Sequence, residues 1–338
     1  MAAGALGRSA SEVTANVYVV HVAGPESVVV AGSRGVLETS DAGARWRNIT
    51  PSTVSGVLVS HIVDIESFGT ARIWLEPVGD MRMDFVPYTD NGGATWSSAV
   101  LPGGAALNGS PLSFWTPESG RALGARNGGA VGVYQAGDGG ASWKRVAGAT
   151  AGPFGGPVTF TSASGGWTWD GGGSMYRTED GGRTWQRVRL PAVRGYKLIA
   201  ADQPESFGGS VVIVIARLRS AGRTTRTAFY ESEDGGASWH PQLAPRSGGG
   251  TSAAFAAGGS DWFVLIGAEL FATPDAGRTW QAVGVRTPAG LSIDAIDYLS
   301  PTIGWAEAAG PPIGERYPTY LLRTTDGGRD WSEVDFPP

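Results

Sequence analysis

Two of the chain's three histidines, His21 and His61, lie in predicted β-strands, and imidazole is a common metal ligand. We expect them at equivalent places on the innermost strands of adjacent structural repeats. There they could line a channel, or hold a metal with Asp64 or Asp297 nearby. Two ligands fall short of a zinc site. Partly buried strand histidines with local hydrogen bonds are the favoured interpretation, and neither a metal nor another cofactor is predicted.

A predicted β-hairpin carries the second candidate, a basic cluster of Arg217, Arg219, Arg223 and Arg226. Guanidinium groups bind carboxylate and phosphate groups, so the cluster could hold an anionic ligand. A solvated hairpin edge explains the same residues. Lys197, on the preceding predicted strand, is a further candidate for polar contacts.

The third candidate is the pair Asp294 and Asp297, at the start of the last predicted repeat. Glycoside hydrolysis uses two carboxyl groups about 5–10 Å apart. Residues i and i+3 of one strand point to opposite faces and lie about 10 Å apart, so this is a poor catalytic pair. Both aspartates therefore remain candidates for binding rather than for catalysis.

The elements that position these side chains follow from a phrase that the chain repeats seven times, [S/T]-x-D-x-G-x-[S/T]-W. Successive copies end on tryptophans that lie 41 to 54 residues apart. In short β-rich units, a period of this size predicts a β-propeller. The acid position holds Asp41, Asn91, Asp138, Asp180, Asp234, Asp275 and Asp326, and the final position holds Trp46, Trp96, Trp143, Trp185, Trp239, Trp280 and Trp331.

The phrase predicts a tight turn between two strands. Its carboxylate can accept hydrogen bonds from backbone N–H groups one or two residues on, and its glycine tolerates positive φ. The tryptophan is expected to pack its ring back onto the hairpin rather than stack on a ligand. Four positions depart from the phrase without changing this expectation: Asn91 at the acid, Ala136 at the first hydroxyl, and Arg45 and Asp330 at the second.

The phrase resembles the Asp-box (BNR) repeat, and the resemblance covers nearly the whole chain. A Gly-Trp-Ala-like strand precedes some boxes, as in Gly304-Trp305-Ala306 and Gly166-Trp167. This wider pattern looks most like the photosystem II assembly-factor group of BNR propellers and their bacterial relatives. The resemblance implies that each box occupies the turn between the third and fourth strands of a blade.

We therefore expect an all-β fold, a seven-bladed β-propeller of four-stranded antiparallel blades with an Asp box in each strand 3–4 turn. Residues 1–12 are small and polar and are expected to be disordered, before a single domain over 13–338. Blades 1 and 7 each contain four predicted strands, so the ring should close by packing rather than by strand exchange. A monomer is expected.

The boxes should crowd the rim of one face, together with the strand 1–2 turns. Ligands of propellers usually bind in the opposite funnel, which long loops on a rigid scaffold surround. That funnel would be built from the links 51–56, 101–110, 147–156 and 245–250 and from the hairpins 76–82, 217–224 and 308–318.

Composition narrows the classes of partner. The net charge is −5 and 17% of residues are charged, so no nucleic-acid partner is expected. Cysteine is absent, which excludes disulfides and thiolate chemistry. No apolar run reaches the ~18 residues of a membrane-spanning helix. From the family resemblance we expect an extracytoplasmic bacterial protein, secreted, periplasmic or surface-anchored, whose export signal is absent from this chain.

Sialidases also resemble this chain through their boxes, but they imply an arginine triad, a Tyr–Glu pair and an early Arg-Ile-Pro motif. The nearest string is Arg72-Ile73-Trp74, which lacks the proline and lies in the second blade. Sialidases also close with six blades, whereas seven are predicted here. A sialidase is therefore not expected.

Two functions remain. The preferred one is a non-catalytic binding or assembly scaffold that uses the face opposite the boxes to bind a protein or another macromolecule, such as a carbohydrate. The alternative is a carbohydrate- or small-molecule-active enzyme, glycosidase-like, with His21, His61, Lys197 and Asp294 in the central funnel. A funnel plugged by Trp115 and Tyr298 would count against the enzyme.

Overall fold

The computed structural model describes residues 17–32, 35–51, 62–77, 85–126, 129, 131–152, 158–169, 174–202, 204–207, 210–246, 251–312 and 318–335. The proposed N-terminal segment 1–12 lies outside these ranges. The described residues form strands and turns without a helix, and so include none that could cross a membrane.

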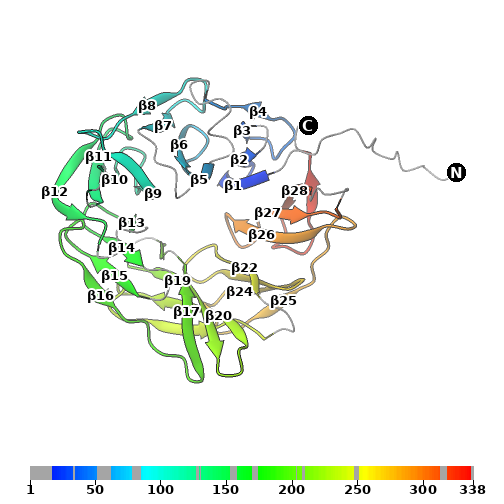
Figure 1. Ribbon diagram of the computed structural model, residues 1–338. Coiled ribbons are helices and arrows are strands. Elements are labelled where there is room, and N and C mark those ends of the chain that lie inside the picture. The colour runs from blue at the N-terminus through cyan, green and yellow to red at the C-terminus, as the bar shows by residue number, and fades with distance from the viewer. Residues whose placement is uncertain are drawn as a thin grey trace.

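The strands form seven antiparallel sheets arranged around a central axis (Figure 1). Blade 1 holds β1 (Val17–Gly24), β2 (Ser27–Gly32), β3 (Gly35–Thr39) and β4 (Arg47–Asn48). Blade 2 holds β5 (Ile62–Phe68), β6 (Arg72–Pro77), β7 (Val86–Thr89) and β8 (Ser97–Ala99). Blade 3 holds β9 (Ala106–Phe114), β10 (Gly120–Ala125), β11 (Gly132–Ala136) and β12 (Lys144–Thr150). Blade 4 holds β13 (Val158–Phe160), β14 (Gly166–Trp169), β15 (Met175–Thr178) and β16 (Gln186–Val188).

Blade 5 is the largest, with β17 (Tyr196–Ala201), β18 (Glu205–Ser206), β19 (Val212–Ser220), β20 (Thr225–Ser232) and β21 (His240–Leu243). Blade 6 holds β22 (Thr251–Ala256), β23 (Trp262–Ile266), β24 (Glu269–Thr273) and β25 (Gln281–Val283). Blade 7 holds β26 (Ser292–Tyr298), β27 (Gly304–Ala309), β28 (Thr319–Thr324) and β29 (Ser332–Val334). Strands follow chain order within each blade, and β18 extends blade 5 beside β19. The predicted seven-bladed propeller is confirmed.

Apolar side chains pack between neighbouring blades. Trp74 of blade 2 stacks on Phe114 of blade 3 with ring centroids 3.8 Å apart. Phe263 of blade 6 stacks on Tyr298 of blade 7 at 3.7 Å. Such pairs bury large rings between sheets and fix the angle at which successive blades meet.

Within the described residues, blades 1 and 7 close the ring without exchanging a strand, as expected. The indole Nε1 of Trp46 donates to the carbonyl of Asp335 at 2.7 Å. The backbone N–H of Val22 donates to Asp297 Oδ2 at 3.3 Å. A buried apolar cluster fills the same seam: Val28, Val30, Trp305, Leu321 and Val334.

The register of the sheets makes equivalent positions comparable between blades. In each blade, one residue of the second strand pairs with the first residue of the repeated phrase, and we call the next residue the core position. The core positions are Val29, Trp74, Arg121, Trp167, Ile213, Phe263 and Trp305. The innermost-strand residues paired with them, here called the inner positions, are His21, Glu66, Ser113, Thr159, Glu205, Phe255 and Asp297.

Candidate functional site

The turns that carry the phrase, here called the repeat turns, lie between the third and fourth strands of the blades. In blade 4, Thr178 Oγ1 donates to Asp180 Oδ1 at 2.8 Å and accepts from the N–H of Gly182 at 2.9 Å. Asp180 Oδ1 accepts from the N–H groups of Arg183 and Thr184, both at 2.9 Å. The expected turn is therefore present, but the acid binds N–H groups three and four residues on, not one or two.

The same hydrogen bond recurs at the other repeat turns, where the side chain at the acid position also accepts from the backbone. The acid position accepts from the N–H four residues on in the turns of Asp41, Asn91, Asp138, Asp234, Asp275 and Asp326. Hydrogen bonds from Thr184 hold the pKa of Asp180 well below its usual range. These carboxylates act as turn acceptors, which supports the structural role assigned to them.

Replacing Thr178 by alanine is expected to lower the free energy of unfolding by about 1–2 kcal/mol, because the buried N–H of Gly182 loses its acceptor. Thr178 is 1% exposed. The matched control is Thr178→Ser, which keeps the hydroxyl that Ser232 supplies in blade 5. Urea denaturation measures both variants. Equal losses in the two would assign the effect to the methyl group instead.

The tryptophans of the phrase are used in packing, as expected, but some of them reach the preceding blade and not only their own hairpin. Trp143, Trp239 and Trp331 are buried. Trp96 Nε1 donates to the carbonyl of Ile49 in the preceding blade at 2.6 Å. Trp185 Nε1 likewise reaches the carbonyl of Thr150 at 3.2 Å.

Of the two candidate histidines, His61 lies outside the described residues. His21 is half-buried on β1 and pairs with Val29. Its counterpart in blade 2 is Glu66, so the predicted equivalence of the two histidines is wrong. His61 precedes Glu66 by five residues in the sequence, which is more than the single register shift between Ile62 and Asp64 could offset. Among the described residues, no three acid or histidine side chains come together as a metal site.

The two candidate aspartates of blade 7 are separated by a register shift in β26. Asp294 is exposed, whereas Asp297 is half-buried and accepts the Val22 N–H at the seam. Burial, together with the charge of Asp294, raises the pKa of Glu307. Asp297 thus supports ring closure, and the pair remains poor for catalysis.

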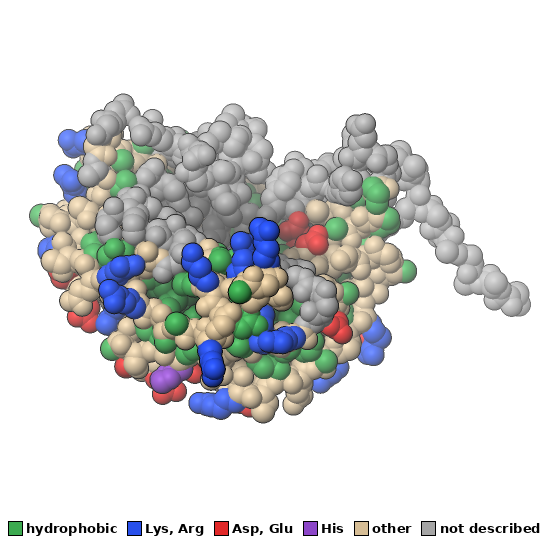
Figure 2. Space-filling model, turned by 60° about the horizontal axis from the view of Figure 1, so that its bottom comes forward, with side chains coloured by type: hydrophobic (Ala, Val, Ile, Leu, Met, Phe, Trp, Pro, Cys, Tyr) green, Lys and Arg blue, Asp and Glu red, His purple; other side chains and the backbone are tan. Residues whose placement is uncertain are grey.

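The basic residues of blade 5 are divided between the two faces of its sheet. Arg217 and Arg219 are exposed on one face of β19, and Lys197 pairs directly with Arg219. Arg226 lies on the other face, donates to the carbonyl of Ala244 and stands 6.0 Å from the Tyr196 ring. Figure 2 shows Lys and Arg side chains on the side of the ring that contains blade 5. Three of the predicted residues therefore form one basic face, Lys197, Arg217 and Arg219.

The basic face lies at the end of blade 5 opposite the repeat turns, because β19 runs from the repeat-turn side toward its hairpin with β20. This is the face that the sequence predicts for binding. Of the other links and hairpins that the sequence predicts for this face, 51–56, 76–82, 147–156, 245–250 and 308–318 fall at least partly outside the described residues.

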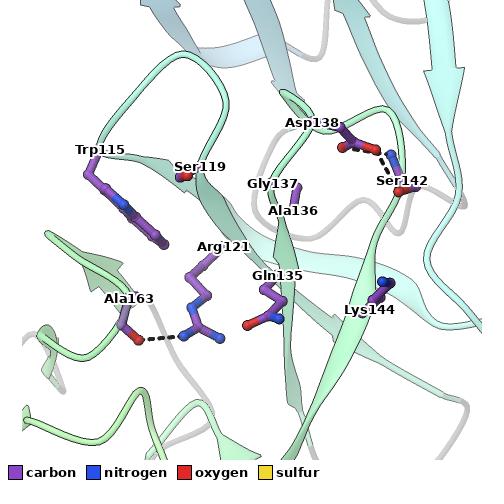
Figure 3. A pocket seen from close by; sticks show the side chains of 10 residues that line it. All are labelled: Trp115, Ser119, Arg121, Gln135, Ala136, Gly137, Asp138, Ser142, Lys144 and Ala163. Atoms are coloured by element: carbon purple, nitrogen blue, oxygen red, sulfur yellow. Dashed lines mark hydrogen bonds between the residues drawn. The ribbon is translucent and has the colours of Figure 1, made fainter.

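Described cavities occur on the repeat-turn side. One of about 430 Å³ is lined by Trp115, Arg121, Gln135 and Lys144 (Figure 3). Another, of about 960 Å³, shares Trp115 and reaches His21 and Glu205. Trp115 follows β9 on this side, and Tyr298 is buried in the stack between blades 6 and 7. Neither side chain plugs the opposite funnel, so these two residues do not count against an enzyme.

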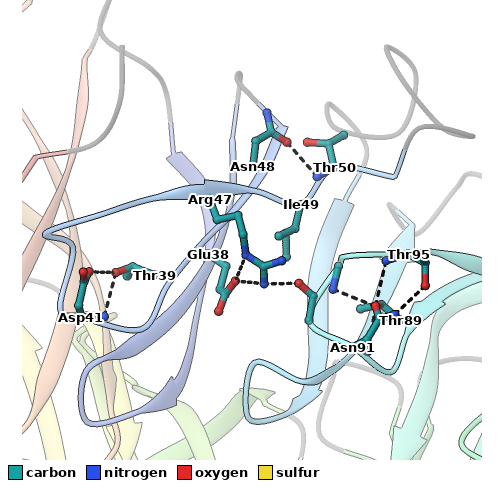
Figure 4. Close-up of polar contacts among 12 residues, drawn as sticks. Glu38, Thr39, Asp41, Arg47, Asn48, Ile49, Thr50, Thr89, Asn91 and Thr95 are labelled. Atoms are coloured by element: carbon teal, nitrogen blue, oxygen red, sulfur yellow. Dashed lines mark hydrogen bonds and ion pairs between the residues drawn. The ribbon is translucent and has the colours of Figure 1, made fainter.

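Arg121 is a functional candidate that the sequence analysis missed. Only 4% exposed, it donates through Nη2 to the carbonyl of Ala163 in the next blade. Its Nε and Nη1 are buried without a hydrogen-bond partner in the described part of the chain. Burial, and then the charge of Arg183, lowers the pKa of Arg121. By contrast, Arg47 links blades 1 and 2 with Glu38 as its ion-pair partner (Figure 4).

Glu205 is the second missed residue. It is half-buried at the inner position of blade 5 and lines the larger cavity. Burial, together with the charges of Asp297 and Asp202, raises its pKa from the usual 4.5 to about 7. Glu205 and Asp297 occupy the inner positions of blades 5 and 7. Their proximity therefore depends on strand register and is not evident from sequence spacing.

No family model matches the sequence, and no curated protein matches it. Among solved structures, the fold is similar to YCF48 from Cyanidioschyzon merolae, with a TM-score of 0.57 and 15% identity over 93% of this chain and 96% of that one. YCF48 bound to a D1 peptide gives 0.51 and 19% identity over 81% and 80%. The extracellular domain of the putative one component system BT4673 from B. thetaiotaomicron gives 0.53 and 8% over 91% and 38%. These similarities establish a shared propeller fold.

Proposed function

We propose that this chain is a non-catalytic scaffold that binds a protein partner through the face opposite the repeat turns. The observation that carries the proposal is the basic face of blade 5. Lys197, Arg217 and Arg219 are exposed on one side of a β-hairpin, and no described acid forms an ion pair with any of them within 4.0 Å. Such a face suits an acidic or carboxylate-bearing segment of a partner.

The similarity to YCF48 supports a polypeptide as the partner. One of the YCF48 structures is described as bound to a D1 peptide, which shows that a propeller of this fold can bind a peptide. The engagement of the repeat-turn acids and of Asp297 in structural hydrogen bonds also favours binding over catalysis.

A second candidate, an enzyme acting on a carbohydrate or another small molecule, is favoured by one observation. The pKa of Glu205 is raised to about 7, the range suited to a general acid, and this residue lines the cavity of about 960 Å³. Release of reducing sugar from a panel of polysaccharides, abolished by Glu205→Gln, would establish this function.

Reversing the basic face in the triple variant K197E/R217E/R219E is expected to reduce capture of the partner from native lysate at least about tenfold, because attraction becomes repulsion. The matched control is R187E/R189E/R194E, which changes the same net charge at three exposed arginines of blade 4 and the link that follows it. Quantitative mass spectrometry of the captured proteins compares both with wild type. A partner that is lost equally from both variants, or from neither, would contradict the proposed surface.

A further inference from the structure

The sevenfold repeat supplies six internal comparisons for every core position. In six blades this position is apolar and buried, and in blade 3 it is arginine. Trp74 of blade 2 stacks on Phe114 of the next blade, and Phe263 of blade 6 stacks on Tyr298. Arg121 takes the corresponding place over Phe160, with its Cζ 5.4 Å from the ring centroid. Blade 3 thus buries a cation where the architecture normally places an apolar side chain.

Packing alone does not account for this cation. Its one hydrogen bond is made by Nη2 to Ala163, and Nε and Nη1 have no partner among the described residues. Two other inter-blade arginines have an acid beside them, since Arg72 pairs with Glu118 at 3.8 Å and Arg177 with Glu179 at 2.8 Å. Arg323 resembles Arg121 in bonding a carbonyl of the next blade and in having a buried Nε without a partner in the described part of the chain, but Arg121 has two such nitrogens. A buried charge without a counter-ion costs stability, so an anion that entered the site would relieve that cost.

The cavity beside Arg121 is built for such an anion. Figure 3 shows the guanidinium of Arg121 between Ala163 and Gln135, with the ring of Trp115 nearby. The exposed Lys144 adds a second cation to the lining. The lining also contains one acid, Asp138, whose two oxygens accept from the N–H and hydroxyl of Ser142 at 3.0 and 2.6 Å.

A second departure from the repeat lines the same cavity. Ala136 stands where the other six repeat turns have Ser or Thr, and it belongs to the cavity lining. In the turn of Asp180 the equivalent residue, Thr178, uses its hydroxyl to bind the acid and the glycine N–H. Ala136 has no such hydroxyl. Two exceptions to the sevenfold pattern therefore meet at one site in blade 3.

We propose that this cavity is a binding site for a carboxylate carried on an apolar or aromatic group. Arg121 lines the cavity and supplies the positive charge that attracts a carboxylate, and Trp115 offers an apolar wall for the attached group. The site is separate from the basic face, since it lies on the repeat-turn side. It does not depend on the proposed scaffold function.

The probe for the test is N-acetylphenylalanine, with its neutral amide as the matched ligand. Titration followed by NMR is expected to shift the side-chain Nε–H signals of Arg121 and Trp115 with the acid and not with the amide. Arg121→Gln should weaken binding at least about tenfold, and Trp115→Ala should reduce it to the level of acetate. Tighter binding of N-acetylphenylalanine than of 3-phenylpropanoate assigns the carboxylate to the end of a polypeptide, and the reverse order to a free small acid.

The control is Arg323→Gln, which removes a similar inter-blade bond, 3.0 Å to the carbonyl of Pro25, at the distant seam and should leave binding unchanged. Arg121→Met separates binding from folding, because an apolar side chain can replace a buried cation without loss of stability. It should keep or raise the melting temperature and abolish binding. Unchanged binding in Arg121→Gln, equal binding of acid and amide, or tighter binding of inorganic phosphate would each overturn the proposal.

Discussion

Replacing Trp305 by alanine is expected to lower the free energy of unfolding by about 3–5 kcal/mol, the range for truncating a buried aromatic side chain. Trp305 is 0% exposed and lies in the cluster that joins blade 7 to blade 1. The indole of Trp305 belongs to the same buried cluster as Val28 and Val30 of blade 1. The cavity left by alanine therefore weakens the packing between blades 7 and 1, where the propeller closes.

Urea denaturation of wild type, Trp305→Ala and Trp305→Phe measures this effect. The phenylalanine variant is the matched control, since Phe263 occupies the same core position in blade 6. It should lose less than half as much stability as the alanine variant. A loss below about 1 kcal/mol in Trp305→Ala would show that other contacts, such as that of Val22 with Asp297, hold the seam.

The architecture could be predicted because its determinants are local and repeated. In the complete repeat turns the hydroxyl and the carboxylate bind backbone groups within four residues, as Thr178 and Asp180 do. Seven such turns at a regular period fix the number of blades. Which N–H groups the acid binds could not be predicted, because this depends on turn geometry that the residue types alone do not determine.

The inner positions could not be predicted because they depend on register. A β-bulge displaces every later side chain, and shifts of this kind occur in the inner strands of blades 1, 2 and 7. The bounds of the strand matter as well: β5 spans Ile62–Phe68, so Glu66 rather than His61 is the counterpart of His21. Glu205 was missed for a related reason, since a short additional strand, β18, places it beside Ile213.

Arg121 was missed although the sequence contains a signal for it. Gly120-Arg121-Ala122 occupies the place of Gly304-Trp305-Ala306, so aligning the repeats of this chain with one another would have found the arginine. The sequence alone still could not show that Nε and Nη1 are buried without a partner. The burial of these nitrogens results from the packing of blade 4 against blade 3, which only the structure shows.

Glu205→Gln is expected to stabilise the fold at high pH and not at low pH. The pKa of Glu205 is about 7 in the folded chain against the ordinary 4.5, so folding favours the protonated acid. Stability is consequently lost as the pH rises from about 4.5 through 7, where the buried carboxyl must ionise beside Asp297 and Asp202. Glutamine is neutral throughout, and its gain should approach at most about 3 kcal/mol near pH 8.

Denaturation curves of wild type and Glu205→Gln between pH 4.5 and 8.5 measure the difference directly. Glu26→Gln is the matched control, because it makes the same substitution at an exposed position in the first turn of blade 1. A gain in Glu205→Gln that stays constant over this range would instead indicate improved packing by the amide. A gain that grows with pH would show that ionising the buried carboxyl of Glu205 destabilises the folded chain.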